Sequence, residues 1–335
     1  MRVNRMPLHG RCLMSDDGVT SPRVAVVVLN WNGWRDTLAC VRSVLAHADP
    51  STRVVVCDNG STDGSCDRLR EAWVGQLACL SADDVVQGTK MLDQRVWLVQ
   101  NGANLGFAGG CNTGVRLAMA SGFDFIWLLN NDTEVEAGAQ QALVARMRQD
   151  DSIGLCGSRL VYFDDPQTVQ ARGGAVYNAH WGIGRHLGVH ESVTAPEDAA
   201  RIEAQMDYVV GASMMASRTF VEAVGPMTED YFLYFEELDW AVRGKDKGFR
   251  LGYAATSVVR HKEGATIGSS HRGTGSMLSM QYLSRNRLKF TARFYPQWLN
   301  SVRRRMAYEA MVYVKRRQWA AARIVLQSLM GKVEA

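Results

Sequence analysis

FDFIWLLNNDTEV, residues 123–135, is a short apolar run that ends in two amides and a carboxylate. A run of this kind, followed directly by polar residues, is typical of a buried strand. The same arrangement recurs in RVVVCDNGSTDGS (53–65) and YFLYFEELD (231–239), and VVRHKEG (258–264) places a histidine after a fourth run. Ligands of open α/β sheets bind at the carboxyl ends of the strands. The pattern therefore predicts an α/β protein with a metal and nucleotide site at one edge of its sheet.

Strands and helices alternate along the front half of the chain. Buried strands are expected at 24–29, 53–58, 96–101 and 123–130. Helices are expected after Asp36, which would cap the first of them, over 109–122 and from about Glu136. Such alternation predicts a mostly parallel sheet wrapped by helices.

The composition is that of a globular protein, with 335 residues, 47% hydrophobic and 21% charged. Because no run of about 18 apolar residues occurs, we expect no membrane-spanning helix. Residues 1–22 lack the continuous apolar segment of a secretory signal and are expected to form a loose tail. The seven cysteines have no paired CxxC spacing, which favours buried thiols in a reducing cytoplasm over disulfides or zinc.

Charge is distributed unevenly. Residues 284–335 contain 12 Lys and Arg against two acids, a net charge of +10, whereas residues 1–283 contain 26 basic and 32 acidic side chains, a net charge of −6. The Gly- and Ser-rich stretch GATIGSSHRGTGS (264–276) is typical of a flexible connection. We therefore expect an α/β domain over 23–270 and a basic, aromatic-rich helical segment over 271–335.

The first predicted strand lacks the loops that most often bind phosphates. It continues into LNWNGW (29–34), which is not GxGxxG, and no GxxxxGK[ST] motif occurs in the chain. A divalent cation bound by hard oxygen ligands is another way to hold a diphosphate, and Asp132 is well placed for this. Asp58 is suited to accept the N3–H of a pyrimidine. For both residues, a role in a turn or as a helix cap is the alternative.

Six motifs in sequence carry a resemblance to a known family. They are LNWNG (29–33), VVVCDNGSTDGS (54–65), NLGFAGGCNTG (104–114), WLLNNDTEV (127–135), FLYFEELDWAVR (232–243) and RHKEGAT (260–266). Residues 24–270 thereby resemble the family-2 inverting glycosyltransferases of the GT-A fold, most of all the bacterial rhamnosyltransferase branch. The resemblance implies a GT-A α/β fold with a mostly parallel central sheet, to which the C-terminal helical segment is added.

The resemblance also implies roles for individual positions. Contacts to the nucleotide and the sugar are expected from Asn30, Asp58, Asn59, Asn104, Gly106, Asn112, Asn130 and Asn131. Asp132 would bind Mg²⁺ or Mn²⁺, and His261 would complete the metal shell unless it is a structural histidine. Asn130 departs from the family, because it stands where the DxD motif has its first acid; as a neutral ligand it would still offer an oxygen.

The acids of FEELD suit the chemistry of an inverting transfer. A single displacement at the anomeric carbon needs a general base for the acceptor hydroxyl. The resemblance implies Glu237 as this base, with Glu236 contacting the acceptor or the sugar. Neighbouring acids keep each other's pKa from falling, which helps a carboxylate act as a base near neutral pH. Asp239 would support them by bonding backbone or Arg243; alternatively, the acids are only the first turn of a helix.

The C-terminal segment combines aromatic side chains with basic clusters at 303–305 and 315–317. Basic helices with interspersed aromatics suit an anionic membrane surface at the inner face of the cytoplasmic membrane. Packing on the α/β domain and a homo-oligomer contact are the alternatives. Nucleic acid is disfavoured as a partner because the front of the chain is net acidic.

Several substrates are compatible with these residues. The resemblance implies dTDP-L-rhamnose as the donor, with a UDP-hexose or UDP-galactofuranose as alternatives, and a saccharide or lipid-linked acceptor in cell-surface polysaccharide synthesis. A sugar-phosphate nucleotidyltransferase is the second alternative. Such enzymes usually have a Gly-rich, basic loop after the first strand, whereas LNWNGW is neither Gly-rich nor basic.

Overall fold

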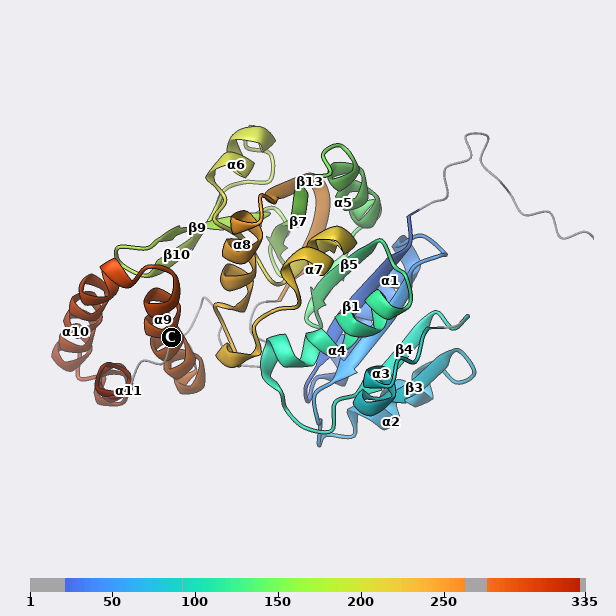
Figure 1. Cartoon of the computed structure of the whole chain (residues 1–335), viewed down its shortest axis with the longest axis horizontal. Helices are drawn as coiled ribbons and strands as arrows, with labels where there is room; N and C mark the ends of the chain where they lie inside the picture. The colour runs from blue at the N-terminus through green and yellow to red at the C-terminus, as the bar shows by residue number, and fades with distance from the viewer. Residues whose placement is uncertain (1–21, 92, 263–275, 332–335) are drawn as a thin grey trace, which may run out of the picture.

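The expected α/β architecture is present in the computed structural model, which describes residues 22–91, 93–262 and 276–331 (Figure 1). The expected loose tail over 1–22 lies outside the described residues except for Pro22. The expected flexible connection over 264–276 lies outside them except for Ser276. The domain limits at 23–270 and 271–335 therefore stay predictions.

The central sheet of the described residues has ten strands. They are β1 (Val24–Asn30), β2 (Arg53–Asp58), β3 (Leu77–Ser81), β4 (Val96–Gln100), β5 (Phe125–Asn130), β6 (Thr133–Val135), β7 (Ile153–Tyr162), β8 (Val169–Arg172), β12 (Ser213–Ser217) and β13 (Arg250–His261). Their order is β3-β4-β2-β1-β5-β12-β7-β13-β6, and β8 pairs with β7. The four predicted strands are confirmed as β1, β2, β4 and β5.

Parallel pairing in the first half of the sheet brings the predicted polar residues together. β1 lies between β2 and β5 and is parallel to both, with Asn30 beside Asp58 and Leu29 beside Asn130. The strand β12 runs antiparallel to both β5 and β7, so the sheet is mixed although most of its pairs are parallel. The mostly parallel α/β class is thus confirmed, and the carboxyl ends of three strands meet at one edge.

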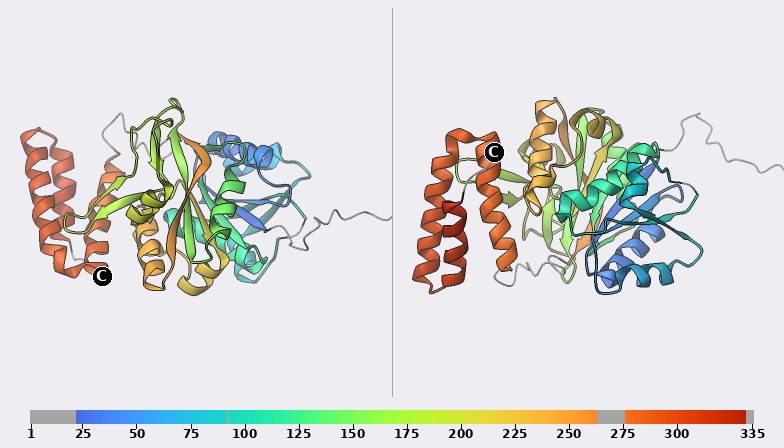
Figure 2. Two further views of the ribbon diagram at one scale, coloured as in Figure 1. Left: turned by 90° about the horizontal axis from the view of Figure 1, so that it is seen from above. Right: turned by 60° about the horizontal axis from the view of Figure 1, so that its bottom comes forward.

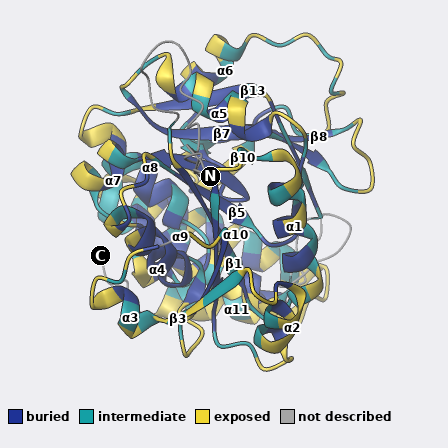
Figure 3. Ribbon diagram, turned by 90° about the vertical axis from the view of Figure 1, so that its right-hand side faces the viewer, coloured by how far each residue is buried: buried dark blue, intermediate teal, exposed yellow. Residues whose placement is uncertain are grey.

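Helices cover both faces of the sheet because side chains alternate along each buried strand. Val24, Val26 and Val28 of β1 pack in the same apolar cluster as residues of α1 (Trp34–His47), α2 (Ser65–Ala72) and α5 (Ala139–Arg148). Ala25 and Val27 point to the other cluster, with α4 (Gly106–Ala120), α7 (Arg218–Val224) and α8 (Glu236–Asp246). Figure 3 shows the strands buried between these layers. Two short helices, α3 (Ala82–Val86) and α6 (Ala199–Gln205), lie at the periphery.

A second, three-stranded sheet links the α/β body to the C-terminal helices. It consists of β9 (Gly174–Asn178), β10 (Ile183–His186) and β11 (Tyr208–Val209), in the order β10-β9-β11. The β9–β10 hairpin projects toward the C-terminal helices (Figure 1).

The C-terminal residues form a three-helix bundle of α9 (Met277–Phe294), α10 (Leu299–Lys315) and α11 (Trp319–Met330) (Figure 2). The bundle has its own core of Leu288, Val302, Met306, Ala310 and Val325. On another face of α9, Phe290 packs against Tyr231 and Leu238 of the α/β body. One predicted alternative, packing of this segment on the α/β domain, is therefore realised by α9. Among the helices of the described residues, none combines the length and the apolar character needed to cross a bilayer.

The predicted cap at Asp36 is wrong. The helix α1 begins at Trp34, with Gly33 at its N-cap and no side-chain cap. Asp36 lies inside the first turn, and its Oδ1 accepts a hydrogen bond from Lys262 Nζ at 2.7 Å. The carboxylate thus ties α1 to the residue that follows β13.

The cysteines are consistent with the expected buried thiols. All six in the described part of the chain are free, and four of them are buried. Burial raises the pKa of both Cys40 and Cys57 to about 12, so neither thiol is ionised near neutral pH.

Candidate active site

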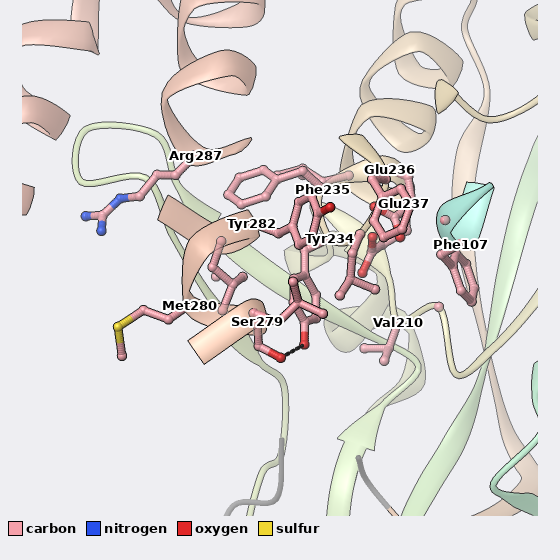
Figure 4. Close-up of a pocket in the computed structure, with 18 of the residues that line it drawn as sticks. Phe107, Val210, Tyr234, Phe235, Glu236, Glu237, Ser279, Met280, Tyr282 and Arg287 are labelled. Atoms are coloured by element: carbon pink, nitrogen blue, oxygen red, sulfur yellow. Dashed lines mark hydrogen bonds between the residues drawn. The ribbon is translucent and has the colours of Figure 1, made fainter. Parts of the chain in front are cut away.

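A cavity of about 940 Å³ opens where the carboxyl ends of β1 and β5 face α8 and α9. It is lined by nine of the fourteen predicted site residues, namely Asn59, Asn104, Gly106, Asn130, Asn131, Asp132, Glu236, Glu237 and His261. The other five, Asn30, Asp58, Asn112, Asp239 and Arg243, are not part of its lining. Figure 4 shows the end of the cavity that lies between α8 and α9.

Asp58 is held in place by neutral donors. Asn30 Nδ2 donates to Asp58 Oδ2 at 2.7 Å, and the backbone N–H of Ser61 donates to Asp58 Oδ1 at 3.0 Å. Asn30 is itself fixed, because its Oδ1 accepts from Thr37 Oγ1 at 2.6 Å. Both Asn30 and Asp58 are buried. Asn30 therefore orients the carboxylate behind the cavity wall.

Asn59 connects β2 to the start of α4. Its Nδ2 donates to Asn104 Oδ1 and to the carbonyl of Gly106, both at 3.0 Å. Gly106 has a φ of +74°, and a Cβ built there would lie 2.2 Å from the carbonyl oxygen of Phe232. Only glycine fits this close approach, which lets Phe107 N donate to the same carbonyl at 2.7 Å. The Asn59 side chain and the Phe107 N–H thus join the end of β2 to the start of α4 and to the segment that precedes α8.

Asn112 is not part of the cavity lining. Its Nδ2 donates to the carbonyl of Met227 at 2.9 Å and to Glu229 Oε1 at 2.8 Å, and its Oδ1 accepts from Met227 N. The residue lies almost two turns into α4, where its side chain is buried against the 227–229 segment. It therefore packs two parts of the body together rather than lining the cavity.

Asp132 and His261 form a buried pair. Asp132 Oδ1 lies 3.2 Å from His261 Nε2, and His261 Nδ1 lies 2.8 Å from Gln170 Oε1. An amide oxygen only accepts, so Gln170 fixes a proton on His261 Nδ1. Nε2 then faces the carboxylate, and at this distance either a proton or a cation lies between the two atoms. The pair is thus suited to share a divalent cation.

Two amides flank this pair. Asn130 Nδ2 lies 3.5 Å from His261 Nε2, and Asn131 Nδ2 donates to Thr37 Oγ1 at 3.2 Å. Among the described residues, no three or more His, Cys, Asp or Glu side chains are placed so that together they could hold a metal ion. A cation held by only two protein side chains would take its remaining ligands from substrate phosphates and water, as Mg²⁺ commonly does.

The strand expected before Glu236–Glu237 is not present, and the pair instead begins α8 after a strained segment. Phe232, Tyr234 and Phe235 have φ values of +65°, +68° and +78°, a region that residues with a Cβ rarely adopt. Strain of this kind is concentrated at functional sites and persists only where the surroundings enforce it.

Asn286 of α9 enforces this conformation. Its buried Nδ2 lies 2.8 Å from the carbonyl oxygen of Tyr231, 2.7 Å from that of Leu233 and 3.2 Å from that of Tyr234. Tyr234 Oη also donates to Ser279 Oγ at 3.0 Å (Figure 4). The C-terminal bundle thus holds the backbone that presents the two carboxyl groups.

Burial governs the electrostatics of the pair. Glu236 Oε2 is buried and, in the described part of the chain, has no hydrogen-bond partner. Burial, with the adjacent charge of Glu237, raises the pKa of Glu236 well above its usual range. Burial also raises the pKa of Glu237 from 4.5 to about 7. A Cβ built on Gly211 would lie 3.9 Å from Glu237 Oε1, so the absence of a side chain there leaves room beside this oxygen.

Asp239 and Arg243 are in contact, as the sequence suggested for them. Asp239 Oδ1 accepts from Arg243 Nε at 2.6 Å and from Thr228 Oγ1 at 2.7 Å. Its Oδ2 accepts from Tyr231 Oη at 3.1 Å and from Arg293 Nη1 at 3.2 Å. This carboxylate is fully bonded and joins α8 to α9, so its role in the structure is to position those elements.

Three contributors to the site were missed by sequence reasoning. Gln170 is a single amide in a strand, Asn286 is a single amide in a basic helix, and Tyr282 stacks on Phe232 with ring centroids 4.9 Å apart. No local motif marks them. The aromatic content of the C-terminal segment is the one signal in the sequence, and it suits a membrane surface equally well.

Comparison with known proteins connects this site to a family. The model of the family described as "Glycosyl transferase family 2" matches residues 25–188. The low-salt glycan biosynthesis hexosyltransferase Agl10 of Haloferax volcanii is 21% identical over 241 residues, which cover 72% of this chain and 67% of that protein. An uncharacterized protein of Mycobacterium tuberculosis is 29% identical over 166 residues, which cover 48% of this chain and 55% of the relative.

Two solved structures share the architecture. GalNAc-T7 with UDP, GalNAc and Mn²⁺ matches with a TM-score of 0.60 at 15% identity, over 84% of this chain and 49% of that one. The mannosyltransferase PcManGT from Pyrobaculum calidifontis, in complex with GDP-Man and Mn²⁺, matches with a TM-score of 0.54 at 14% identity, over 92% of this chain and 86% of that one. These likenesses show the fold, and the family match agrees with the motifs that line the cavity. Residues 25–188 are therefore similar to glycosyl transferase family 2, and the chain has a GT-A-like fold with added C-terminal helices.

Proposed function

We propose that the protein transfers a hexose from a nucleoside diphosphate sugar to a hydroxyl group of a saccharide or lipid-linked acceptor, with inversion at the anomeric carbon. One observation carries the proposal. Glu237, whose pKa is raised to about 7 by burial, lines the same cavity as the Asp132–His261 pair. A proton acceptor and a site for a charged diphosphate thus share one cavity, which is what a single displacement requires.

The residues divide the reaction between them. Glu237 accepts the proton of the acceptor hydroxyl while the acceptor oxygen forms its bond to the anomeric carbon. The bond from that carbon to the diphosphate breaks, and its electron pair leaves with the diphosphate. Glu236, which holds its proton because its pKa is raised well above the usual range, is suited to donate a hydrogen bond to the acceptor or the sugar.

Asp132 and His261 are the residues that would hold Mg²⁺ or Mn²⁺, with the amide oxygen of Asn130 as a further neutral ligand. A divalent cation bound there would neutralise charge that develops on the leaving diphosphate. The buried Asp132–His261 pair fits such a cation, because its two facing acceptors are 3.2 Å apart. Both solved structures compared above carry Mn²⁺ with a nucleotide or a nucleotide sugar.

For the donor we propose dTDP-L-rhamnose, on the resemblance of the six motifs to bacterial rhamnosyltransferases. UDP-hexoses and UDP-galactofuranose are the alternatives. The resemblance also gives Asp58, whose carboxylate Asn30 and Ser61 orient behind the cavity wall, the role of accepting from N3–H of a pyrimidine. A role in cell-surface polysaccharide synthesis, at the inner face of the cytoplasmic membrane, follows from the same resemblance.

Donor binding tests the proposal directly. Melting temperatures would be measured with dTDP-, UDP- and GDP-sugars, each with Mn²⁺ and with a chelator. We expect the largest rise with a pyrimidine sugar in Mn²⁺, and a smaller rise when Asp58 is changed to Asn. Stabilisation by a GDP-sugar alone would refute the pyrimidine role, and no response to any nucleotide sugar would refute the proposed function.

A further inference from the structure

The outer faces of α10 and α11 are exposed, and both combine cationic with large apolar side chains. On α10 the exposed face contains Arg304, Tyr308, Met311 and Lys315. On α11 it contains Trp319, Arg323, Leu326 and Met330. Both sets follow the spacing i, i+4, i+7, i+11, which places four side chains along one side of a helix. We call these eight residues the outer face of the bundle.

The outer face is not needed to hold the bundle together. The opposite sides of the two helices supply Val302, Met306, Ala310 and Val325, which pack with Leu288 of α9. Trp319 is nevertheless 64% exposed and Met330 78% exposed. Large apolar side chains at such exposure, gathered along two neighbouring helices, mark an interaction surface.

The charge of this surface has one sign. In the described part of the bundle, residues 276–331, the only acid is Glu309, and it pairs with Arg287 and Arg305 at 2.9 Å each. No ion pair with a described residue is formed by Arg304, Lys315, Arg316, Arg317 or Arg323. The exposed turn between the helices, 316–318, thus adds two cations to the three on the outer face.

The cations and apolar side chains of the outer face together indicate what kind of partner it binds. A second copy of the same face would bring cations against cations, which disfavours self-association through it. Nucleic acid would satisfy the cations but leave Trp319, Leu326 and Met330 without an apolar environment. A bilayer with anionic headgroups offers phosphates to the cations and an interfacial apolar layer to the other side chains.

We propose that the outer face of the bundle and its 316–318 turn bind the surface of an anionic lipid bilayer. The binding is peripheral, with Trp319, Leu326 and Met330 at the headgroup boundary and the cations at lipid phosphates. The same bundle supplies Tyr313 and Val325 to the wall of the cavity that contains Glu237. Lipid binding would therefore bring the cavity close to membrane-bound acceptors, but it does not depend on the proposed transferase function.

Flotation of the full chain with vesicles tests the proposal. The vesicles contain phosphatidylcholine alone or with phosphatidylglycerol. We expect the wild-type chain to float only with the anionic vesicles. The triple change of Lys315, Arg316 and Arg317 to Glu should lower the partition coefficient by roughly fivefold or more per cation, because each contributes electrostatic attraction near the surface. The change of Trp319 and Met330 to Ser should lower it at constant charge.

A charge-matched control uses three exposed arginines remote from the bundle. Changing Arg42, Arg148 and Arg201 to Glu alters the net charge equally and should leave flotation unchanged. The proposal would be overturned if the Lys315/Arg316/Arg317 variant floated as well as the wild type. It would also be overturned if the Trp319/Met330 variant bound anionic vesicles with the partition coefficient of the wild type. A dimer that these changes convert to a monomer would instead assign the face to self-association and would also overturn it. Melting curves show whether each variant is folded.

Discussion

The two sides of the cavity treat their carboxyl groups differently. On the side of the sheet, Asp58 accepts from Asn30 and Ser61, and Asp132 faces a histidine that Gln170 orients. On the side of α8, Glu236 Oε2 has no partner among the described residues, and the pKa values of both glutamates are raised.

The difference separates binding from proton chemistry. Carboxyl groups with dedicated polar partners are fixed in position, which suits recognition of a base or a cation. Carboxyl groups removed from water keep or regain a proton near neutral pH, which suits acid–base work. Asp239 supports this distinction between bonded and unbonded carboxyl groups. It lies on the same helical turn as the glutamates, but both of its oxygens accept hydrogen bonds, and it joins α8 to α9.

The largest effect is expected at Glu237. The change Glu237→Gln keeps the shape of the side chain but removes the proton acceptor, so kcat should fall by roughly 10²- to 10⁴-fold. The affinity for the donor should stay unchanged, as measured by calorimetry in parallel with the transfer rate. Glu222→Gln, at an exposed site outside the cavity, is the matched control. Near-normal turnover of Glu237→Gln would remove Glu237 from the role of base.

A smaller loss is expected from Asn286, which acts only through the position of the glutamates. Asn286→Leu removes the donor that the three carbonyls share, and the released segment should misplace Glu237. Misplacement by about 1 Å can cost on the order of 10² in rate, so kcat should fall while KM for the donor is retained.

The pH dependence of this variant shows whether Asn286 positions Glu237 or only stabilises the fold. The quantity to compare is the pH at which activity reaches half its maximum. It should move away from about 7 as the burial of Glu237 changes. Asn286→Gln should recover part of the rate, and Asn300→Leu, at an exposed position in the first turn of the same bundle's second helix, should have no effect. An unchanged pH dependence with reduced kcat would contradict a positioning role.

The other side of the cavity is tested through Gln170. Loss of the residue that orients a metal-binding histidine typically costs 10- to 100-fold in metal affinity or activity, and we expect a loss of about this size for Gln170→Leu. Mn²⁺ affinity, measured by titration in the presence of a nucleoside diphosphate, should fall while the pH dependence set by Glu237 stays unchanged. A variant with normal Mn²⁺ affinity would show that His261 is a structural histidine.

The strand ends could be predicted from the sequence because each is a local pattern. Apolar runs followed by Asp58, by Asn130 to Asp132 and by His261 identify the ends of β2, β5 and β13, and ligands of such sheets bind at this edge. The run before Glu236-Glu237 is the exception: it forms no strand, because Phe232, Tyr234 and Phe235 have positive φ values and α8 begins at Glu236. The order of the six motifs carries the resemblance to the GT-A glycosyltransferases, and that resemblance predicted the fold.

Contacts between distant segments could not be predicted. Gln170 lies 91 residues from His261, and Asn286 lies 53 residues from Leu233, with no motif at either position. Asn112 was predicted to line the nucleotide because it belongs to a motif, but the helical rotation from Gly106 turns it toward Met227. The antiparallel insertion of β12 between β5 and β7 likewise depends on tertiary pairing and not on any local pattern.

A change of about tenfold in kcat per pH unit is expected below pH 7. Because Glu237 must be ionised to accept a proton, activity should rise with pH through about 7 and level off above it. Below that value, each pH unit should lower kcat about tenfold. The measurement is the transfer rate from pH 5 to 9 at saturating donor and metal. A plateau that extends down to pH 5 would mean that Glu237 has an ordinary pKa and that burial does not tune it.

The smallest effect concerns stability and has the opposite sign to the loss of activity. The native pKa of Glu237, about 7, lies above its ordinary value of 4.5, so the native state binds this proton more tightly than the unfolded state. The free energy of unfolding therefore decreases as pH rises from 4.5 to about 7 and stays lower above it. Glu237→Gln cannot ionise and should melt above the wild type at pH 8 by a few degrees. At pH 4 the two proteins should melt together. A variant that melts below the wild type at pH 8 would show that polar partners stabilise the ionised carboxylate of Glu237.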